Sequence, residues 1–290
     1  MGRNRSKGTS RGKQPTRGSG TSAQRQRPDS PPRQPEKRGR KTAPNFGDQL
    51  EGRNVVLAAM EASKRVKELW VDQRAKPEPK LNGILALARE RGIKVEAVPR
   101  AELDAVSRAA VHNGLIGFAH PLPSPSLKEV LDRVSDAGRE PFIVLLDQVQ
   151  YEQNLGAILR SAAAAGADAV VIPTRRGASM SPTVQRVAMG GAEVVPLVRE
   201  SMTSATVTLA RRGIRILAAE ADGDCPYWDA DFSGPLALAL GGEDRGVGAK
   251  VRERCDQVVA VPIDTDGPVT SLNVSVTAGL LFFERVRQTR

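Results

Sequence analysis

Short apolar runs alternate with helix-patterned segments along the second half of the chain. The strand-like runs cover residues 142–146, 169–172, 194–198, 214–218, 236–240 and 257–261, and the helical patterns between and after them cover 155–165, 183–189, 204–212 and 272–283. Strands that alternate with helices are typical of a parallel sheet that is covered on both faces. The sequence therefore predicts an α/β domain in this half.

A second α/β pattern precedes it. Helices are expected over 51–63, 81–91 and 102–108 and strands over 66–71, 93–98 and 115–119, which predicts a small three-layer domain. The Pro-rich run 120–125 suits a linker, and a short helix over 127–134 follows it. We expect a tail over 1–45, a small domain over 46–120, a linker over 121–139 and a larger domain over 140–290.

The positive charge of the chain is concentrated at its N-terminus. Residues 1–45 hold 13 Lys or Arg against Asp29 and Glu36, so the rest of the chain sums to about −1 of the total +10. Because the tail has no Val, Ile, Leu, Phe, Tyr or Trp, it cannot bury enough apolar surface to order itself, and we expect disorder. A polyanion is the natural partner. A solubilising extension and a transit peptide are the alternatives.

Several classes of protein and site are disfavoured. No apolar stretch reaches the length of a membrane span, so a soluble, cytoplasmic protein without a membrane partner is expected. Cys225 and Cys255 are too few and too far apart for a zinc site, and we expect no metal. Rossmann, Walker, His-Glu-x-x-His and Cys-x-x-Cys motifs are missing. Both histidines, His112 and His120, precede the second domain, which excludes a histidine-based triad there.

Three motifs in the second domain follow strand-like runs. The first runs from Asn154 to Ala162 and contains Arg160, the second is the glycine-rich stretch 241–246 with Glu243, and the third runs over 262–275 and ends in Ser271-Leu272-Asn273-Val274-Ser275. Each has a plain structural explanation: a solvated arginine, a surface turn, and helix-capping residues. Loops at strand ends are also where α/β proteins bind ligands.

Taken together, the motifs resemble those of a known family. Asn-x-Gly-x-x-x-Arg-Ser-Ala, then Gly-Gly-Glu-x-x-Gly, then Pro followed by Gly-x-Val-x-Ser-Leu-Asn-Val-Ser are similar to the three motifs of the SpoU class of RNA ribose 2′-O-methyltransferases, over residues 144–284. The stretches 51–54 and 112–114 resemble the ribosomal-protein-like RNA-binding domain of the 23S rRNA guanosine 2′-O-methyltransferases in this class.

The resemblance implies a SPOUT methyltransferase domain whose C-terminal part is threaded into a trefoil knot, a rare exception to the rule that chains are unknotted. It also implies S-adenosylmethionine as the cofactor, RNA as a partner, and a homodimer with active sites at its interface. Matching positions assign cofactor contacts to Gly241, Val261 and Leu272. Catalytic or substrate-orienting roles fall on Asn154, Arg160, Glu243, Ser271 and Asn273.

The role of Arg160 has two interpretations. The family proposals make this arginine a general base, but a guanidinium keeps its proton far above neutral pH, so an anchor for phosphate is favoured on physical grounds. Glu243 could accept a proton or hold Arg160 in place. The loop at 264–266 is longer and more acidic than the family usually shows, which bears on the contact assigned to Val261 beside Pro262.

The expected function is 2′-O-methylation of a ribose in RNA with S-adenosylmethionine as the methyl donor, most closely that of a guanosine in 23S rRNA. Three alternatives stay open: methylation of a tRNA ribose, methylation of an antibiotic-binding rRNA loop, and a non-catalytic RNA-binding factor in ribosome assembly. The joint presence of Asn154, Arg160, Glu243 and Asn273 favours an enzyme over the last of these.

Overall fold

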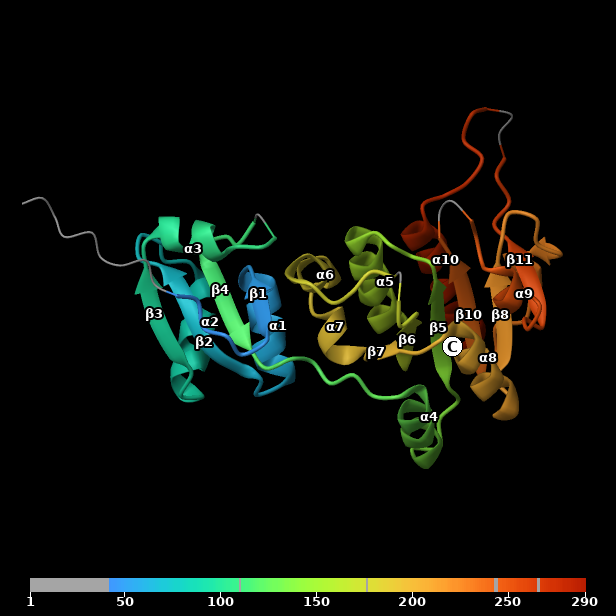
Figure 1. Ribbon diagram of the computed structural model, residues 1–290, viewed down its shortest axis with the longest axis horizontal. Coiled ribbons are helices and arrows are strands. Elements are labelled where there is room, and N and C mark those ends of the chain that lie inside the picture. The colour runs from blue at the N-terminus through green and yellow to red at the C-terminus, as the bar shows by residue number, and fades with distance from the viewer. Residues whose placement is uncertain (1–41, 110, 176, 243–244, 265–266) are drawn as a thin grey trace, which may run out of the picture. The chain divides into compact units, whose positions relative to one another are not determined.

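The structure is a computed structural model that describes residues 42–290 apart from 110, 176, 243–244 and 265–266 (Figure 1). The expected disordered tail therefore lies almost wholly outside the described residues. Two sheets are formed, one from residues 48–119 and one from residues 142–260. Each is described by itself below.

The first sheet has four strands and is mixed. Its elements are β1 (Asp48–Glu51), α1 (Arg53–Ala62), β2 (Val66–Asp72), α2 (Pro79–Glu90), β3 (Lys94–Val98), α3 (Arg100–Val106) and β4 (Leu115–Ala119). The strand order is β1-β4-β2-β3, and β4 runs antiparallel to both β1 and β2. Helices α1 and α2 cover one face and α3 covers the other, so the expected three layers are present.

Strand β1 was not expected from the sequence. The prediction of a helix from residue 51 is wrong at its start, because α1 begins at Arg53 after Gly52, whose φ is 105°. Strand β1 has no apolar pattern because it buries polar groups. The Glu51 carboxylate accepts hydrogen bonds from Gln49 Nε2, Ser107 Oγ and the Arg108 amide, at 2.7, 2.5 and 2.6 Å. A buried carboxylate whose hydrogen bonds are satisfied in this way is taken for an exposed residue when the sequence is judged by hydropathy.

The second sheet has seven strands, all of them parallel. Its strands are β5 (Phe142–Asp147), β6 (Ala169–Ile172), β7 (Leu197–Arg199), β8 (Arg215–Ala219), β9 (Cys225–Pro226), β10 (Leu236–Gly241) and β11 (Gln257–Ala260), in the order β7-β6-β5-β10-β8-β11-β9. The predicted parallel α/β sheet is confirmed.

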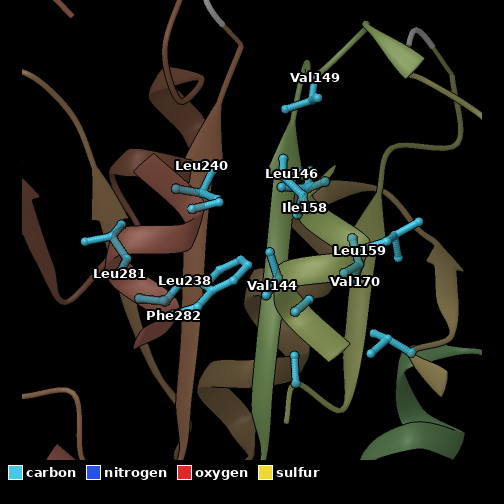
Figure 2. Packing of buried hydrophobic residues seen from close by; sticks show 14 of the residues in the cluster. Val144, Leu146, Val149, Ile158, Leu159, Val170, Leu238, Leu240, Leu281 and Phe282 are labelled. Atoms are coloured by element: carbon cyan, nitrogen blue, oxygen red, sulfur yellow. The ribbon is translucent and has the colours of Figure 1, made fainter. Parts of the chain in front are cut away.

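Helices cover both faces of this sheet. They are α4 (Leu127–Asp136), α5 (Glu152–Ala165), α6 (Pro182–Ala188), α7 (Gly191–Val194), α8 (Met202–Arg211), α9 (Ala249–Arg252) and α10 (Val274–Thr289). Along each strand alternate side chains serve opposite faces. Val144 and Leu146 pack with α5 and α10, whereas Ile143 and Leu145 pack with α4 and α8. Figure 2 shows the first of these clusters, with Ile158 and Leu159 of α5 on one side and Leu281 and Phe282 of α10 on the other.

Two predicted elements differ in extent. The strand expected over 194–198 is β7 only, because α7 occupies 191–194 and Pro196 removes an amide donor just before β7 begins. The last helix begins at Val274 rather than 272 and continues to Thr289. Its final turns stay ordered because Arg285 Nη1 donates to the carbonyls of Phe232 and Gly234, at 2.6 and 2.9 Å.

Gly156 of the first motif is required by helix packing. A Cβ at this position of α5 would lie 2.6 Å from the Cβ of Val187 and 3.0 Å from the carbonyl oxygen of Val184, both on α6. Contacts this short force a shift of side chain or backbone. The glycine of the motif therefore sets the close approach of α5 and α6.

We expect Gly156→Ala to destabilise the fold by about 1–3 kcal/mol through overpacking, which outweighs the gain of roughly 1 kcal/mol in helix propensity. Gly83→Ala on α2 is the matched control, because a Cβ there meets no atom within 4 Å. Thermal unfolding of the two variants and the parent should show a lowered Tm for Gly156→Ala alone. Equal Tm values for both variants would mean that α6 adjusts at no cost.

Candidate functional site

The strand order places one crevice in the second sheet. Strand β10 lies between β5 and β8, and the chain leaves β5 towards β6 but leaves β10 towards β11, in the opposite direction. The carboxyl ends of adjacent strands whose connections diverge in this way leave a crevice where α/β proteins bind ligands. The loops that follow β5 and β10 therefore form the candidate site.

The loop after β10, residues 241–246, depends on its glycines, and we call it the glycine loop. A Cβ on Gly241 would lie 1.9 Å from the carbonyl carbon of Gly246, and one on Gly242 would lie 2.6 Å from the carbonyl oxygen of Gln148. Gly246 has a φ of 61°, and its amide donates to the Gly242 carbonyl at 2.9 Å. The Gly-Gly-x-x-x-Gly spacing therefore closes a tight turn against the end of β5.

Two carboxylates hold the exit of this turn. The Val247 amide donates to the Glu220 carboxylate, which follows β8, and the Gly248 amide donates to Asp147 Oδ2 at 2.8 Å, at the end of β5. The neighbours of β10 on both sides thus each contribute one acceptor to consecutive amides. Hydrogen bonds to charged groups stabilise by about 1.5–3 kcal/mol each, so the loop is fixed from both flanks.

A cavity of about 450 Å³ lies beside the loop. We call it the glycine-loop cavity. The three residues expected to contact a cofactor, Gly241, Val261 and Leu272, all line it, and so does Ser271. The other described residues around it are Ala219, Glu220, Ala221, Leu240, Gly242, Gly246, Pro262, Ile263, Thr270, Val274 and Thr277. Motifs from two distant parts of the sequence therefore meet in one mostly uncharged wall.

A second cavity of about 530 Å³ shares Gly242 and Val274 with the first. It contains Asn154, and we call it the Asn154 cavity. Its other described lining residues are Asp147, Gln148, Val149, Gln150, Tyr151, Pro173, Arg175 and Arg245. Exposed cationic and aromatic side chains at its rim contrast with the wall of the glycine-loop cavity.

Asn154 and Asn273 meet between the first and third motifs. Asn273 Nδ2 donates to Asn154 Oδ1 at 3.1 Å, while Asn273 Oδ1 accepts from the amide and the hydroxyl of Ser275 at 2.9 and 2.7 Å. Asn273 is the N-cap of α10. The sequence predicts a helix from residue 155, directly after Asn154, but α5 begins at Glu152 with Tyr151 as its N-cap. Asn154 therefore lies buried in the first turn, turned towards α10.

Within one chain, Arg160 lies apart from Asn154 and Asn273. It is exposed on α5 and lines neither cavity. Six residues after Asn154, it points about 120° away around the helix axis. Glu243, the fifth residue assigned a catalytic or orienting role, lies outside the described residues.

Asp147, Glu220, Tyr151 and Arg175 were missed by the sequence analysis. Asp147 and Glu220 directly follow apolar runs, and this position at a strand end was the signal that could have found them. In the described part of the chain, no three His, Cys, Asp or Glu side chains are grouped as a metal site. No helix among the described residues is long and apolar enough to cross a bilayer.

Comparison with known proteins gives two family matches. A model described as the SpoU rRNA Methylase family matches residues 141–283, and one described as RNA 2′-O ribose methyltransferase substrate binding matches residues 49–125. These matches confirm the resemblance found in the sequence.

Curated relatives match over most of their length. A Pseudomonas putida protein named 23S rRNA (guanosine-2′-O-)-methyltransferase RlmB is 38% identical over 78% of this chain and 90% of its own. A Mycobacterium avium protein named as an uncharacterized tRNA/rRNA methyltransferase is 36% identical over 91% of this chain and 83% of its own.

A solved structure shares the fold. The SpoU methyltransferase AviRb from Streptomyces viridochromogenes, in complex with the cofactor AdoMet, superimposes with a TM-score of 0.70 at 25% identity, over 83% of this chain and 91% of that one.

The two hydrogen-bonding roles of Asn273 can be separated by mutation. We expect Asn273→Ala to lower the free energy of unfolding by about 1–2 kcal/mol through loss of the α10 cap, and Asn273→Ser to retain most of that stability because serine also caps. Urea unfolding checks this. Both variants lose the amide that donates to Asn154, so a loss of activity shared by both would come from that contact. Equal destabilisation by serine and alanine would contradict the capping role.

Proposed function

The chain belongs to the SpoU rRNA methylase family and is an RNA ribose 2′-O-methyltransferase, and we propose that its substrate is a guanosine ribose in 23S rRNA. The observation that carries this proposal is the meeting of all three motifs at one edge of the sheet, where Asn154 contacts Asn273 and the glycine loop separates two cavities. A relative 38% identical, matched over nine-tenths of its length, supports the choice of rRNA. An rRNA substrate implies a cytoplasmic location.

S-adenosylmethionine is the cofactor, and the glycine-loop cavity fits it. The absence of side chains at Gly241 and Gly246 lets the loop fold tightly against its own backbone and Glu220, so that backbone groups line the cavity. Val261, Ile263 and Leu272 offer apolar surface for a purine ring. Drug-sized ligands occupy pockets of roughly 300–1,000 Å³ that are largely apolar, with a few polar groups. Gly241, Val261 and Leu272 would contact the cofactor. When bound, it supplies a methyl group already activated by the positive charge on sulfur.

The Asn154 cavity is the proposed place of the target nucleotide. Arg175 and Arg245 lie at its rim, where guanidinium groups can bind phosphate oxygens, and Tyr151 is 64% exposed beside them, where a base can stack on its ring. Asn154 and Asn273 would orient the ribose hydroxyl by hydrogen bonding, without adding charge. Ser271, which lines the neighbouring cavity, would complete the polar contacts at the junction.

We propose that a second copy of the chain completes the site. Arg160 lies away from Asn154 and Asn273 within one chain, so a contribution from Arg160 to the same reaction requires the partner's copy. As an anchor for RNA phosphate it would keep its charge throughout, which a guanidinium does at any physiological pH. The alternative is the general-base role, in which Glu243 would hold the side chain.

An exposed apolar stripe on α10 supports the homodimer. Val276, Leu280 and Phe283 are 51, 38 and 51% exposed, and their spacing of four and three residues places them on one side of the helix. The opposite side, with Ala278, Leu281 and Phe282, is buried in the core. A helix that is apolar on both sides is buried on both sides in its working state.

We also propose the trefoil knot. Helix α10 follows β11, which lies beyond β8 from β10, yet α10 packs on α5 and β10 at the centre of the sheet. The described parts of the connecting segment, 261–264 and 267–273, include residues that line the glycine-loop cavity. Threading of this segment through the connection that precedes β10 would give the knot implied by the family.

The test of function is a map of ribose methylation in 23S rRNA from a strain that lacks this protein. We expect one guanosine to lose its resistance to alkaline cleavage, and the purified protein with S-adenosylmethionine to restore it in vitro. Asn154→Ala should reduce that restoration at least tenfold, whereas Gly83→Ala, outside the second domain, should not. An unchanged rRNA map together with a missing tRNA methylation would move the substrate to tRNA. A lack of methyl transfer to either RNA would favour a binding protein.

The dimer has its own test. We expect Phe283→Asp to yield monomers in size-exclusion chromatography with light scattering, because a charge in an apolar interface is costly to desolvate. Val95→Asp is the matched control, since Val95 is a similarly exposed apolar residue, 43%, on β3. The monomeric variant should bind cofactor weakly or not at all and lose methyl transfer. A parent protein that is itself monomeric at working concentration would exclude the shared site.

A further inference from the structure

Glu220 is the one charged side chain among the described residues that line the glycine-loop cavity. It follows the last residue of β8, is half-buried, and accepts a hydrogen bond from the Val247 amide. A Cβ placed on Gly246 would lie only 2.5 Å from Glu220 Oε2, so the carboxylate lies directly against the loop. Glu220 belongs to none of the three family motifs.

The proposed reaction changes the charge of the molecule in that cavity. The ribose 2′ oxygen forms a bond to the methyl carbon, the carbon–sulfur bond breaks with its electron pair staying on sulfur, and the hydroxyl proton is released. A sulfonium cation is thereby converted into a neutral thioether, while the ammonium and carboxylate groups of both molecules are the same. Only the cofactor carries the extra positive charge.

We propose that Glu220 selects the sulfonium form, so that the cavity binds S-adenosylmethionine in preference to S-adenosylhomocysteine. This inference rests on the proposed function. A carboxylate in a half-buried cavity attracts a cation at an effective dielectric constant of about 20, well below that of water, and it offers the neutral thioether no equivalent attraction. The product therefore loses an attraction that the cofactor had, which favours its exchange for fresh cofactor.

Two features of the geometry strengthen the assignment. Asp147, the other carboxylate that holds the loop, lines the Asn154 cavity and not this one, so the charge beside the cofactor comes from Glu220. The rest of the described wall is apolar or carries neutral hydroxyl and backbone groups, whose dipoles favour a sulfonium over a thioether less strongly than a full negative charge does. Among the described lining residues, selection by charge therefore falls to Glu220.

A purely structural role makes a different prediction. If Glu220 only holds the Val247 amide, its loss disturbs the loop and weakens both ligands by the same factor. Glutamine keeps the shape of the side chain and an oxygen that can accept from the Val247 amide, so Glu220→Gln removes the charge while the loop contact is kept. The ratio of the two affinities separates the roles.

The experiment is isothermal titration calorimetry of the full chain with S-adenosylmethionine and with S-adenosylhomocysteine. For Glu220→Gln we expect the affinity for S-adenosylmethionine to fall about tenfold and that for S-adenosylhomocysteine to change less than threefold. Glu220→Asp, which keeps the charge, should keep the parent's ratio of affinities. Equal weakening of the binding of both ligands, which leaves the ratio of affinities unchanged, would overturn the proposal.

Asp222→Asn is the matched control. Asp222 lies two residues further along, outside the described cavity lining, and its side chain is 71% exposed in an ion pair with Arg252, whose hydrogen bond lowers the pKa of that carboxyl. Loss of its charge should leave the ratio of affinities as in the parent. If the parent binds neither ligand, the proposed function itself fails. If the parent binds both ligands without preference, only the charge selection by Glu220 fails.

Discussion

The position of β10 between β5 and β8 is the constraint on which the site depends. It places the glycine loop between two strands that each have a carboxylate at their carboxyl end, so that Glu220 accepts from the Val247 amide and Asp147 accepts from the Gly248 amide. The loop contributes almost no side chains of its own at its closest approaches, because Gly241 and Gly242 pack backbone against backbone. Its shape is therefore set by its neighbours, and its two sides become the walls of two different cavities.

Glycine residues and side-chain amides determine much of the geometry around this loop. Gly156 lets α6 approach α5 closely. The Asn154–Asn273 contact connects the motif that follows β5 with the one that precedes α10. Because neither amide titrates, this connection is independent of pH. Among the described residues that line the two cavities, the charged ones lie at the flanks: Asp147, Glu220 and the arginines of the rim.

The architecture of the second domain could be predicted from the sequence because its strands are continuous apolar runs. The ends of those runs, including β5, β6 and β10, agree with the structure within a residue or so. Prediction failed where polar groups are buried with partners that are distant in the sequence. Strand β1 was missed because Glu51 is satisfied by hydrogen bonds from a loop 56 and 57 residues later, which no local pattern can show.

The site was predictable to a similar degree and for a similar reason. Gly241, Val261 and Leu272 were assigned by resemblance and lie around one cavity, whereas Glu220 was overlooked because it belongs to none of the three motifs and only its position after an apolar run marks it. Its role depends on strand order, which brings β8 beside β10 across a connection that local periodicity does not specify. The contact between Asn154 and Asn273 could not be predicted from local sequence for the same kind of reason, since the two residues are 119 positions apart.

Helix α10 connects assembly and chemistry through a single rigid element. Its first residue follows the Asn273 cap, its middle carries the apolar stripe, and its sixteen residues span about 24 Å. In the proposed homodimer, the partner would cover the stripe, reduce fraying of the helix and so hold its first turn, where Asn273 meets Asn154. The abundance of the protein in the cell would then set the fraction of copies in which this contact is held, so that the proposed activity would rise more steeply than in proportion to concentration.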